Sequence, residues 1–241
     1  MPTLVTLDSA MRGKKRRNIV VKVKEDAKKA KKVAEPPVKT TVLFPQPPVV
    51  DEELQSIQAT FPPNFRLVRR IGKGGYGEVF HAMDEKSNVH CAIKLMNGDS
   101  DSGLAMTIVR EAAILRGLQP HEHIVKLQDV IFAGKAVGFV LELCTMDLWM
   151  YMHRKKKLDI SEQRSFTRQI LEGVAYMHAR RVAHRDLKPS NILLMVSGES
   201  VTLKIADFGL GRPLNSSGVY TPKCTTVIYR SPEVRMPYYL L

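Results

Sequence analysis

The sequence predicts an α+β fold of two lobes, a strand-rich one followed by a helical one, after an N-terminal tail. From Phe65 onward, short apolar segments alternate with turn residues, a pattern that indicates strands. After Ser161 the apolar residues recur at helical spacing. Residues 1–60 instead combine basic clusters with prolines, a composition typical of extended and unpacked backbone. The 241 residues suffice for one sizeable core plus such a tail.

Each expected element rests on a local pattern. Short apolar runs are expected to be strands at 65–71, 78–82, 89–95, 125–131 and 137–143. A helix is expected over 104–118, because its apolar residues share one face. A second helix follows Ser161, which we expect to be its N-cap, with Glu162 in the first turn. Residues 51–57 are compatible with a further short helix.

The chain is strongly basic. Its formal net charge is +13, from 37 basic and 24 acidic residues, which favours attraction to phosphates, nucleic acid or acidic protein surfaces. Two basic clusters in the tail, 12–17 and 28–32, are compatible with a bipartite signal for a nuclear import receptor or with a solvated basic linker. Because no aromatic-interleaved nucleic-acid motif accompanies them, the sequence gives no strong indication of nucleic-acid binding.

Cysteine usage and hydropathy indicate the cellular compartment. Cys91, Cys144 and Cys224 are scattered and form no CxxC pair, so neither a zinc site nor a disulfide framework is expected. The apolar runs are too short to span a bilayer, and the N-terminus lacks a compact apolar signal core. We therefore expect an intracellular protein of the nucleus or cytoplasm, with no membrane partner.

A glycine-rich turn joins the first two expected strands and reads Gly72-Lys73-Gly74-Gly75-Tyr76-Gly77. Glycines allow backbone N–H groups to approach phosphate oxygens without side-chain clash. A dinucleotide-binding fold needs a helix directly after such a turn. Here a strand follows, so a different phosphate-binding arrangement is indicated, although a glycine turn between strands is common.

Lys94 lies on the third expected strand, beyond the glycine turn. An ammonium group in that position can hold two phosphates, provided that a carboxylate positions it. Glu111, on the helix that follows, is the candidate carboxylate. Without further context, an exposed strand lysine is the plainer interpretation of Lys94.

A loop with several functional groups at fixed spacing favours the phosphate-binding interpretation of Lys94 over that of an exposed strand lysine. It reads His184-Arg185-Asp186-Leu187-Lys188-Pro189-Ser190-Asn191, and Asp207-Phe208-Gly209 follows it. Asp186 can accept the proton of a substrate hydroxyl, and Lys188 can stabilise a transferring phosphoryl group. Asn191 and Asp207 can bind a metal ion. Phosphoryl transfer requires this set of groups, so the sequence predicts that chemistry.

From about Phe65 to its end, the chain resembles a eukaryotic protein kinase, matching in order the glycine turn, strand lysine, helix glutamate, catalytic loop and metal-binding triplet. The resemblance implies a bilobal fold with a β-rich N-lobe at 61–143, a partial helical C-lobe at 144–241 and a disordered tail at 1–60. It implies ATP and Mg²⁺ as cofactors, with Asp186, Lys188 and Lys94 as catalytic residues and Asn191 and Asp207 as metal ligands.

The resemblance also assigns residues to the nucleotide site. Leu141 is the implied gatekeeper, and the apolar spine of an active kinase is matched by Leu115, Leu127, His184 and Phe208. The implied ATP-binding residues are Ile71, Gly72, Lys73, Gly74, Gly75, Tyr76, Gly77, Val79, Ala92, Lys94, Glu111, Glu142, Cys144, Asp147 and Leu193.

Within the family, residues 102–111, 121–130 and 220–233 resemble cyclin-dependent kinases, with a cyclin-type activator as the implied partner. In this branch Thr221 is the implied activating phosphorylation site, although an ordinary loop threonine is the alternative. Its phosphate would be held by Arg110, Arg185 and Arg212. Tyr76 matches an inhibitory tyrosine, but Gly75 replaces the usual neighbouring threonine.

The implied activity is that of a serine/threonine protein kinase acting on protein substrates, with a preference for Ser or Thr followed by proline. A mitogen-activated kinase ranks lower, because the Thr-x-Tyr doublet is absent at Thr221. Only eight residues follow Glu233, so we expect an incomplete C-lobe with exposed apolar faces. Two alternatives therefore remain open: a truncated, inactive module that binds ATP or a partner, and a basic nucleic-acid-binding protein.

Overall fold

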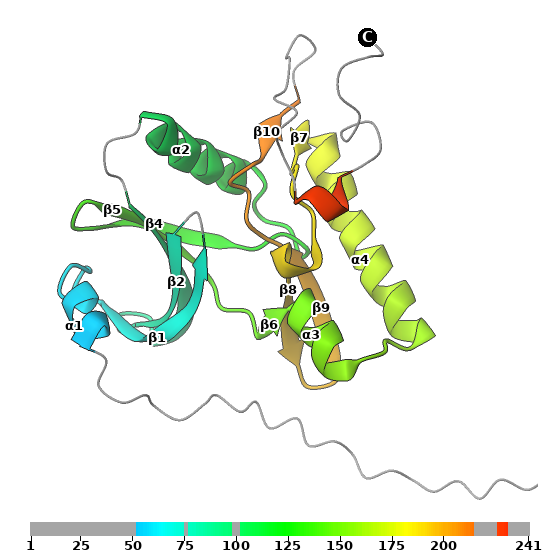
Figure 1. Cartoon of the computed structure of the whole chain (residues 1–241), viewed down its shortest axis with the longest axis horizontal. Coiled ribbons are helices and arrows are strands. Elements are labelled where there is room, and N and C mark those ends of the chain that lie inside the picture. Colours follow the sequence, from blue (N-terminus) through cyan, green and yellow to red (C-terminus); the bar gives the residue numbers. More distant parts are fainter. Residues whose placement is uncertain (1–51, 75–76, 98–101, 215–225, 231–241) are drawn as a thin grey trace, which may run out of the picture. The chain divides into compact units, whose positions relative to one another are not determined.

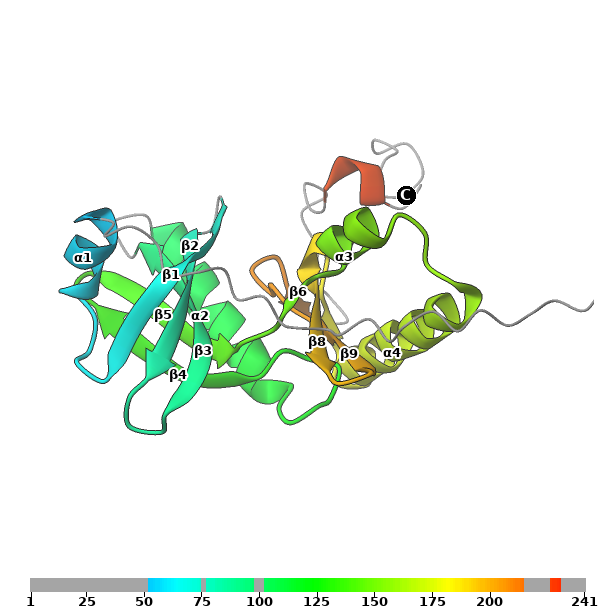
Figure 2. The ribbon, with the colours of Figure 1, turned by 90° about the horizontal axis from the view of Figure 1, so that it is seen from below.

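The computed structural model describes residues 52–74, 77–97, 102–214 and 226–230. The predicted basic clusters, Gly75, Tyr76 and Thr221 lie outside these residues. The described residues confirm the bilobal α+β fold, with a five-stranded sheet and one long helix in the N-lobe and two further helices with small sheets in the C-lobe (Figures 1 and 2). Among them, no helix combines the length and apolar character that crossing a membrane requires.

The N-lobe sheet is antiparallel, with strand order β1-β2-β3-β5-β4. Each strand overlaps one of the predicted runs: β1 (Phe65–Gly74), β2 (Gly77–Asp84), β3 (Val89–Asn97), β4 (Leu127–Ala133) and β5 (Ala136–Glu142). The predicted first helix is α2 (Ser102–Gly117), which packs against β4 beside the sheet (Figure 1). Ile108 and Leu115 on its predicted apolar face are buried.

A short helix, α1 (Glu52–Gln58), packs against the N-lobe in a range that was expected to be tail. Leu54 and Ile57, about one helical turn apart, are half-buried against a cluster of apolar residues that includes Phe61, Phe65 and Phe80. The spacing of the two residues gives this helix an apolar face to bury. The short helix that the sequence allowed at 51–57 therefore forms, although residues 1–60 were assigned to the tail.

The described part of the C-lobe contains two α-helices and two small antiparallel sheets, ordered β6-β8-β9 and β10-β7. Its elements are β6 (Met146–Asp147), α3 (Leu148–Lys155), α4 (Ile160–Ala179), β7 (Val182–Ala183), η1 (Pro189–Asn191), β8 (Ile192–Ser197), β9 (Ser200–Ile205), β10 (Arg212–Pro213) and η2 (Val227–Tyr229). Ile192 at the start of β8 pairs with Ile205 at the end of β9, so the β8–β9 hairpin places the loop that ends at Asn191 and the turn that contains Asp207 at the same end.

The N-cap of α4 is Asp159, so the prediction of Ser161 was wrong. Asp159 has extended backbone, and its side chain accepts the N–H of Glu162 at 2.8 Å. Glu162 in turn accepts the N–H of Asp159 at 3.0 Å, which completes a capping box. Ser161 already has helical backbone, and its hydroxyl donates to Asp159 Oδ1 at 2.7 Å. Both residue types favour N-caps, so composition could not separate them.

The helix α4 buries one face and exposes the other. Its buried residues are Phe166, Gln169, Gly173 and Met177, with Ile170 and Val174 partly buried in the same core. The only large apolar side chains that it exposes are Ile160 and Leu171. The sequence predicted exposed apolar surface on this helix, and these two side chains provide it.

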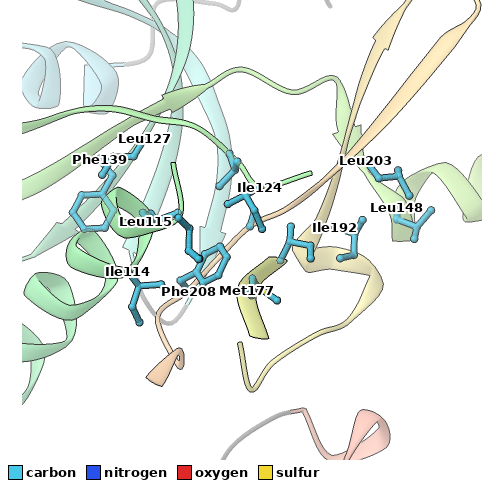
Figure 3. Close-up of a cluster of buried hydrophobic side chains, with 14 of the residues drawn as sticks. Ile114, Leu115, Ile124, Leu127, Phe139, Leu148, Met177, Ile192, Leu203 and Phe208 are labelled. Atoms are coloured by element: carbon cyan, nitrogen blue, oxygen red, sulfur yellow. The ribbon is translucent and has the colours of Figure 1, made fainter. Parts of the chain in front are cut away.

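A single apolar cluster spans both lobes. Figure 3 shows Leu115, Leu127 and Phe139 from the N-lobe grouped with Ile124 and Phe208, while Leu148, Met177, Ile192 and Leu203 continue the cluster into the C-lobe. Backbone pairing between Ile124 and Ile205 crosses the same region. The loops that carry polar functional groups therefore rest on one continuous core.

Candidate active site

Lys94 is held between two carboxylates. Strand alternation places Ala92 and Lys94 on one face of β3. Cys91 and Ile93 lie on the opposite face, in the apolar cluster that contains Phe61, Phe65 and Phe80. The Nζ atom of Lys94 lies 2.8 Å from Oε1 of Glu111 and 2.8 Å from Oδ1 of Asp207. The predicted contact with Glu111 therefore forms, and a third group joins it.

The electrostatics of this cluster keep Lys94 charged. Burial by itself lowers the pKa of Lys94, but the carboxylates of Glu111 and Asp207 together outweigh it, so its pKa lies above the ordinary value. Burial raises the pKa of Glu111, and the ammonium group of Lys94 opposes that rise. A charged ammonium at this position is available for phosphate oxygens.

Asp186 is buried at the centre of a hydrogen-bond network. Its Oδ2 accepts from Lys188 Nζ at 2.7 Å and from Asn191 Nδ2 at 3.1 Å. Its Oδ1 accepts from the backbone N–H of Thr226 at 3.0 Å and lies 3.2 Å from the Thr226 hydroxyl. This hydroxyl also lies 3.1 Å from Lys188 Nζ. The network thus holds the carboxylate from the catalytic loop and from the segment near η2.

These contacts favour the ionised form of Asp186. Burial raises its pKa, but the hydrogen bonds from Lys188 and Thr226 and the charge of Lys188 lower it further, so the net pKa lies below the ordinary 3.8. The carboxylate is therefore ionised at neutral pH, as a group that must accept a proton has to be.

His184 and Phe208 support the loops that carry Asp186 and Asp207. Their ring centroids are 4.8 Å apart, and both side chains are buried. His184 Nε2 lies 2.9 Å from the carbonyl oxygen of Ala206. Burial lowers the pKa of His184, which favours a neutral ring. Leu115 and Leu127, the other two predicted spine residues, are buried in the cluster that contains Phe208.

Asn191 and Asp207 are suited to a divalent cation. Asn191 directly precedes β8, and Asp207 lies two residues after the end of β9. These strand ends are paired, since Ile192 lies opposite Ile205. The N–H of Ala206 also donates to the carbonyl of Asn191 at 2.9 Å. The Nδ2 atom of Asn191 is directed to Asp186, so its amide oxygen is the group that it can offer to a metal. Carboxylate and amide oxygens are ligands that Mg²⁺ accepts.

The strands around the glycine turn are closely fitted. Gly74 lies opposite Gly77 in the register of β1 and β2. Gly77 has φ of +131°, and a Cβ atom there would lie 2.1 Å from the carbonyl oxygen of Leu95, so only glycine fits. The register shift between Arg70 and Gly72 leaves Ile71 unpaired, with 39% of it exposed. Lys73 forms an ion pair with Glu78 at 2.8 Å.

The other predicted nucleotide contacts lie on neighbouring elements. Val79 pairs with Lys94 across β2 and β3, which places Val79 on the same side of the sheet as Ala92. Leu193 on β8 pairs with Asp147 on β6. Asp147 has a role that the sequence did not reveal, since its Oδ1 accepts the N–H of Met150 at 2.7 Å and caps α3.

Glu142, the last residue of β5, and Cys144 were predicted to bind ATP. The N–H of Glu142 already donates to the carbonyl of Lys126 at 3.1 Å. Its side chain accepts the N–H of Lys126 at 2.7 Å and forms an ion pair with Lys204 at 3.0 Å. Lys204 was not identified from the sequence as a partner of Glu142, because nothing in the sequence around a single lysine on a strand indicates which carboxylate it will contact. Burial raises the pKa of the nearby Cys144 thiol to about 12.

The three arginines predicted to bind a phosphate come from elements that pack together. Arg110 lies on α2, which contacts β10, and Arg212 on β10 pairs with Ala183, two residues before Arg185. All three side chains are partly buried. Within the described residues, Nη1 of Arg212 is buried without a hydrogen-bond partner, an arrangement that favours an added anion.

The two-lobed fold, with Lys94 paired to Glu111 and Asp207 and with Asp186 held by Lys188 and Asn191, is that of a protein kinase. Residues 65–237 match the protein kinase domain family, well over half of the chain, so the chain belongs to that family.

Among its curated relatives, the chain is similar to cyclin-dependent kinase 2 of Caenorhabditis elegans, with 41% identity over 176 residues that cover 70% of this chain and 47% of the relative. It is also similar to cell division control protein 2 homolog 1 of Trypanosoma brucei brucei, with 40% identity over 173 residues that cover 70% of this chain and 56% of that protein. The chain thus spans about half the length of these relatives.

Proposed function

We propose that this chain, by itself or within a longer protein, transfers the γ-phosphoryl group of ATP to serine or threonine hydroxyls of proteins. The observation that carries the proposal is the environment of Asp186, an ionised carboxylate fixed by Lys188, Asn191 and Thr226. Such a carboxylate orients the attacking hydroxyl and accepts its proton.

The residues around Asp186 have separate roles in binding and neutralising the phosphates. Lys94, positioned by Glu111, binds phosphate oxygens, and Lys188 faces the charge that develops on the transferring group. Asn191 and Asp207 would hold Mg²⁺, which supplies neutralisation of phosphate charge when it is bound. Because Asp207 contacts Lys94 here, nucleotide binding exchanges one charge-assisted contact of Lys94 for another.

Phosphotransfer from ATP to a basic protein substrate tests this function. The wild-type chain should label the substrate in a Mg²⁺-dependent manner, and Asp186→Asn should abolish labelling while retaining ATP binding. Glu199→Gln, which alters an exposed carboxylate in the β8–β9 turn, is the matched control. ATP binding without transfer by the wild type would indicate the inactive binding module instead.

The finer assignments concern the partner and the substrate. The exposed side of α2 carries Met106 and Val109, which are 60% and 63% exposed, beside the buried Ile108 and Glu111. Exposed apolar side chains on the helix that positions Glu111 support a cyclin-type activator, in keeping with the name of the Caenorhabditis elegans relative. A preference for Ser-Pro or Thr-Pro sites follows from the same resemblance and is measured with peptide pairs that differ only in that proline.

The basic tail supports a nuclear location through an import receptor. A fluorescent fusion of the chain should accumulate in nuclei, and alanine at the basic positions of 12–17 and 28–32 should abolish accumulation. Equal distribution of both fusions between nucleus and cytoplasm would contradict this assignment.

A further inference from the structure

Helix α1 contacts the outer edge of the N-lobe sheet through the side chain of Gln58. The carboxamide of Gln58 accepts the N–H of Leu67 at 2.6 Å and donates to the carbonyl of Phe65 at 2.8 Å. It thus makes the two hydrogen bonds that a neighbouring strand would make with β1. Since β1 is an edge strand of the sheet, these bonds fix its first half against α1.

A second connection lies nearer the glycine turn. Arg70 Nη2 lies 2.6 Å from Oε2 of Glu53 on α1, and Arg70 Nη1 lies 3.5 Å from Oε1 of Glu78 on β2. The same Oε1 of Glu78 lies 2.8 Å from Nζ of Lys73. One chain of charges therefore runs from α1 through both strands that flank the turn.

These contacts lie where the backbone pairing of β1 is irregular. Its register with β2 shifts between Leu67 and Arg69 and again between Arg70 and Gly72. Bulges bend a strand and interrupt its ladder, so the backbone alone holds this part of β1 less firmly. Side chains of α1 and β2 supply the missing constraint next to Gly72, the first glycine of the turn.

The burial of the pairs points the same way. The side chains of Arg70 and Glu78 are 25% and 22% exposed, whereas those of Arg66 and Glu85, an ion pair at the other end of the same hairpin, are 56% and 51% exposed. Solvent screens the Arg66–Glu85 pair more strongly than the Arg70–Glu78 pair. The Arg70–Glu53 pair is intermediate, because its side chains are 25% and 57% exposed.

We propose that α1, acting through Glu53 and Arg70, positions the glycine turn for the nucleotide, so these two are positioning residues for ATP affinity. The part of the inference that concerns ATP rests on the function proposed above. A turn that is held in place before binding loses less conformational freedom when the nucleotide binds, and the affinity rises accordingly.

The test compares Glu53→Gln and Arg70→Gln with Glu85→Gln, which breaks the Arg66–Glu85 pair, as the matched control. The first readout is amide hydrogen exchange of 72–74 and 77–79 in nucleotide-free protein. The second is the Kd for Mg·ATP, with KM for ATP and kcat where transfer is measured. We expect faster exchange in both test variants and a Kd raised about threefold by Glu53→Gln and more by Arg70→Gln, with kcat unchanged.

The two readouts separate the inference from the proposed function. Exchange rates in the Glu53→Gln variant that equal those of the control would overturn the positioning role, whatever the nucleotide affinity. A wild type that fails to bind Mg·ATP would overturn the proposed function, while faster exchange in the variants would still support the connection of α1 to the turn. Glu53 is 57% exposed in its side chain, so its substitution is compatible with folding.

Discussion

Thr226 donates its backbone N–H to Oδ1 of Asp186 at 3.0 Å, although forty residues separate the two in the chain. The side-chain hydroxyl of Thr226 lies within hydrogen-bond distance of both Asp186 and Lys188. The segment near η2 thus contributes directly to the position and the ionisation of Asp186, the carboxylate proposed to accept the substrate proton.

Replacing Thr226 with Val removes the hydroxyl and keeps a side chain of similar shape. We expect kcat to fall about tenfold with little change in KM for ATP, because one charge-assisted hydrogen bond in the reacting group is lost. Thr226→Ser should retain most of the activity. An unchanged kcat for Thr226→Val would show that the hydroxyl is dispensable.

The pH dependence of the same variant has a defined sign. The hydrogen bond from Thr226 lowers the pKa of Asp186, so its removal should bring that pKa closer to 3.8. The acid limb of the pH profile of kcat, where Asp186 becomes protonated, should then move to higher pH in Thr226→Val. A shift to lower pH would contradict the role of Asp186 as proton acceptor.

Substitution of Lys94 tests the charged cluster. Lys94→Met removes the ammonium from between Glu111 and Asp207, and we expect kcat/KM for ATP to fall at least about a hundredfold. Glu111→Gln should lower kcat/KM for ATP by a smaller factor, since the amide can still contact Lys94. Steady-state kinetics measure both, with Lys126→Met, an exposed lysine, as the control. Comparable kinetics for Lys94→Met and the control would rule out this role.

Thr221 and Arg212 should act as one switch. In protein that an upstream kinase has phosphorylated, Thr221→Ala and Arg212→Gln should lower activity to similar levels. The double variant should be no worse than either one, because both remove the same phosphate contact. Ser216→Ala serves as the control within the same segment. Additive losses would indicate that the buried Nη1 of Arg212 has another partner.

The N-cap of α4 can be located by thermal unfolding. Asp159→Ala should lower Tm by several degrees, whereas Ser161→Ala should have a smaller effect. Hydrogen bonds from the Glu162 N–H and the Ser161 hydroxyl lower the pKa of Asp159 from 3.8 to about 2. The stabilisation from Asp159 is therefore present above about pH 4 and is lost as pH falls toward 2. A larger loss of Tm in Ser161→Ala would restore the original prediction.

The sequence predicted contacts whose chemistry demands a partner. A lysine on a strand below a glycine turn requires a carboxylate, so the meeting of Lys94 with Glu111 followed from residue types and element order. The bilobal fold followed from the change of periodicity near the middle of the chain. In both cases the local pattern and the tertiary structure favour the same arrangement.

Other features could not be predicted, because they depend on long-range geometry. Gln58 and Arg70 are residue types that are common on protein surfaces, so the sequence does not single them out. Only the fold brings Gln58 to the edge of β1 and Arg70 to Glu53. Asp159 and Ser161 are both good N-cap residues, and the backbone conformation decides between them. The burial of Lys204 against Glu142 likewise has no local signature.

The half-buried Cys144 has a consequence for chemical probes of this site. Burial raises the pKa of this thiol to about 12, so very little of it is ionised at neutral pH, and the thiolate is the form that attacks electrophiles. Acrylamide-type inhibitors directed at this cysteine should therefore label it slowly. Reversible ligands that derive selectivity from shape and from backbone hydrogen bonds are the better starting point for inhibiting this protein.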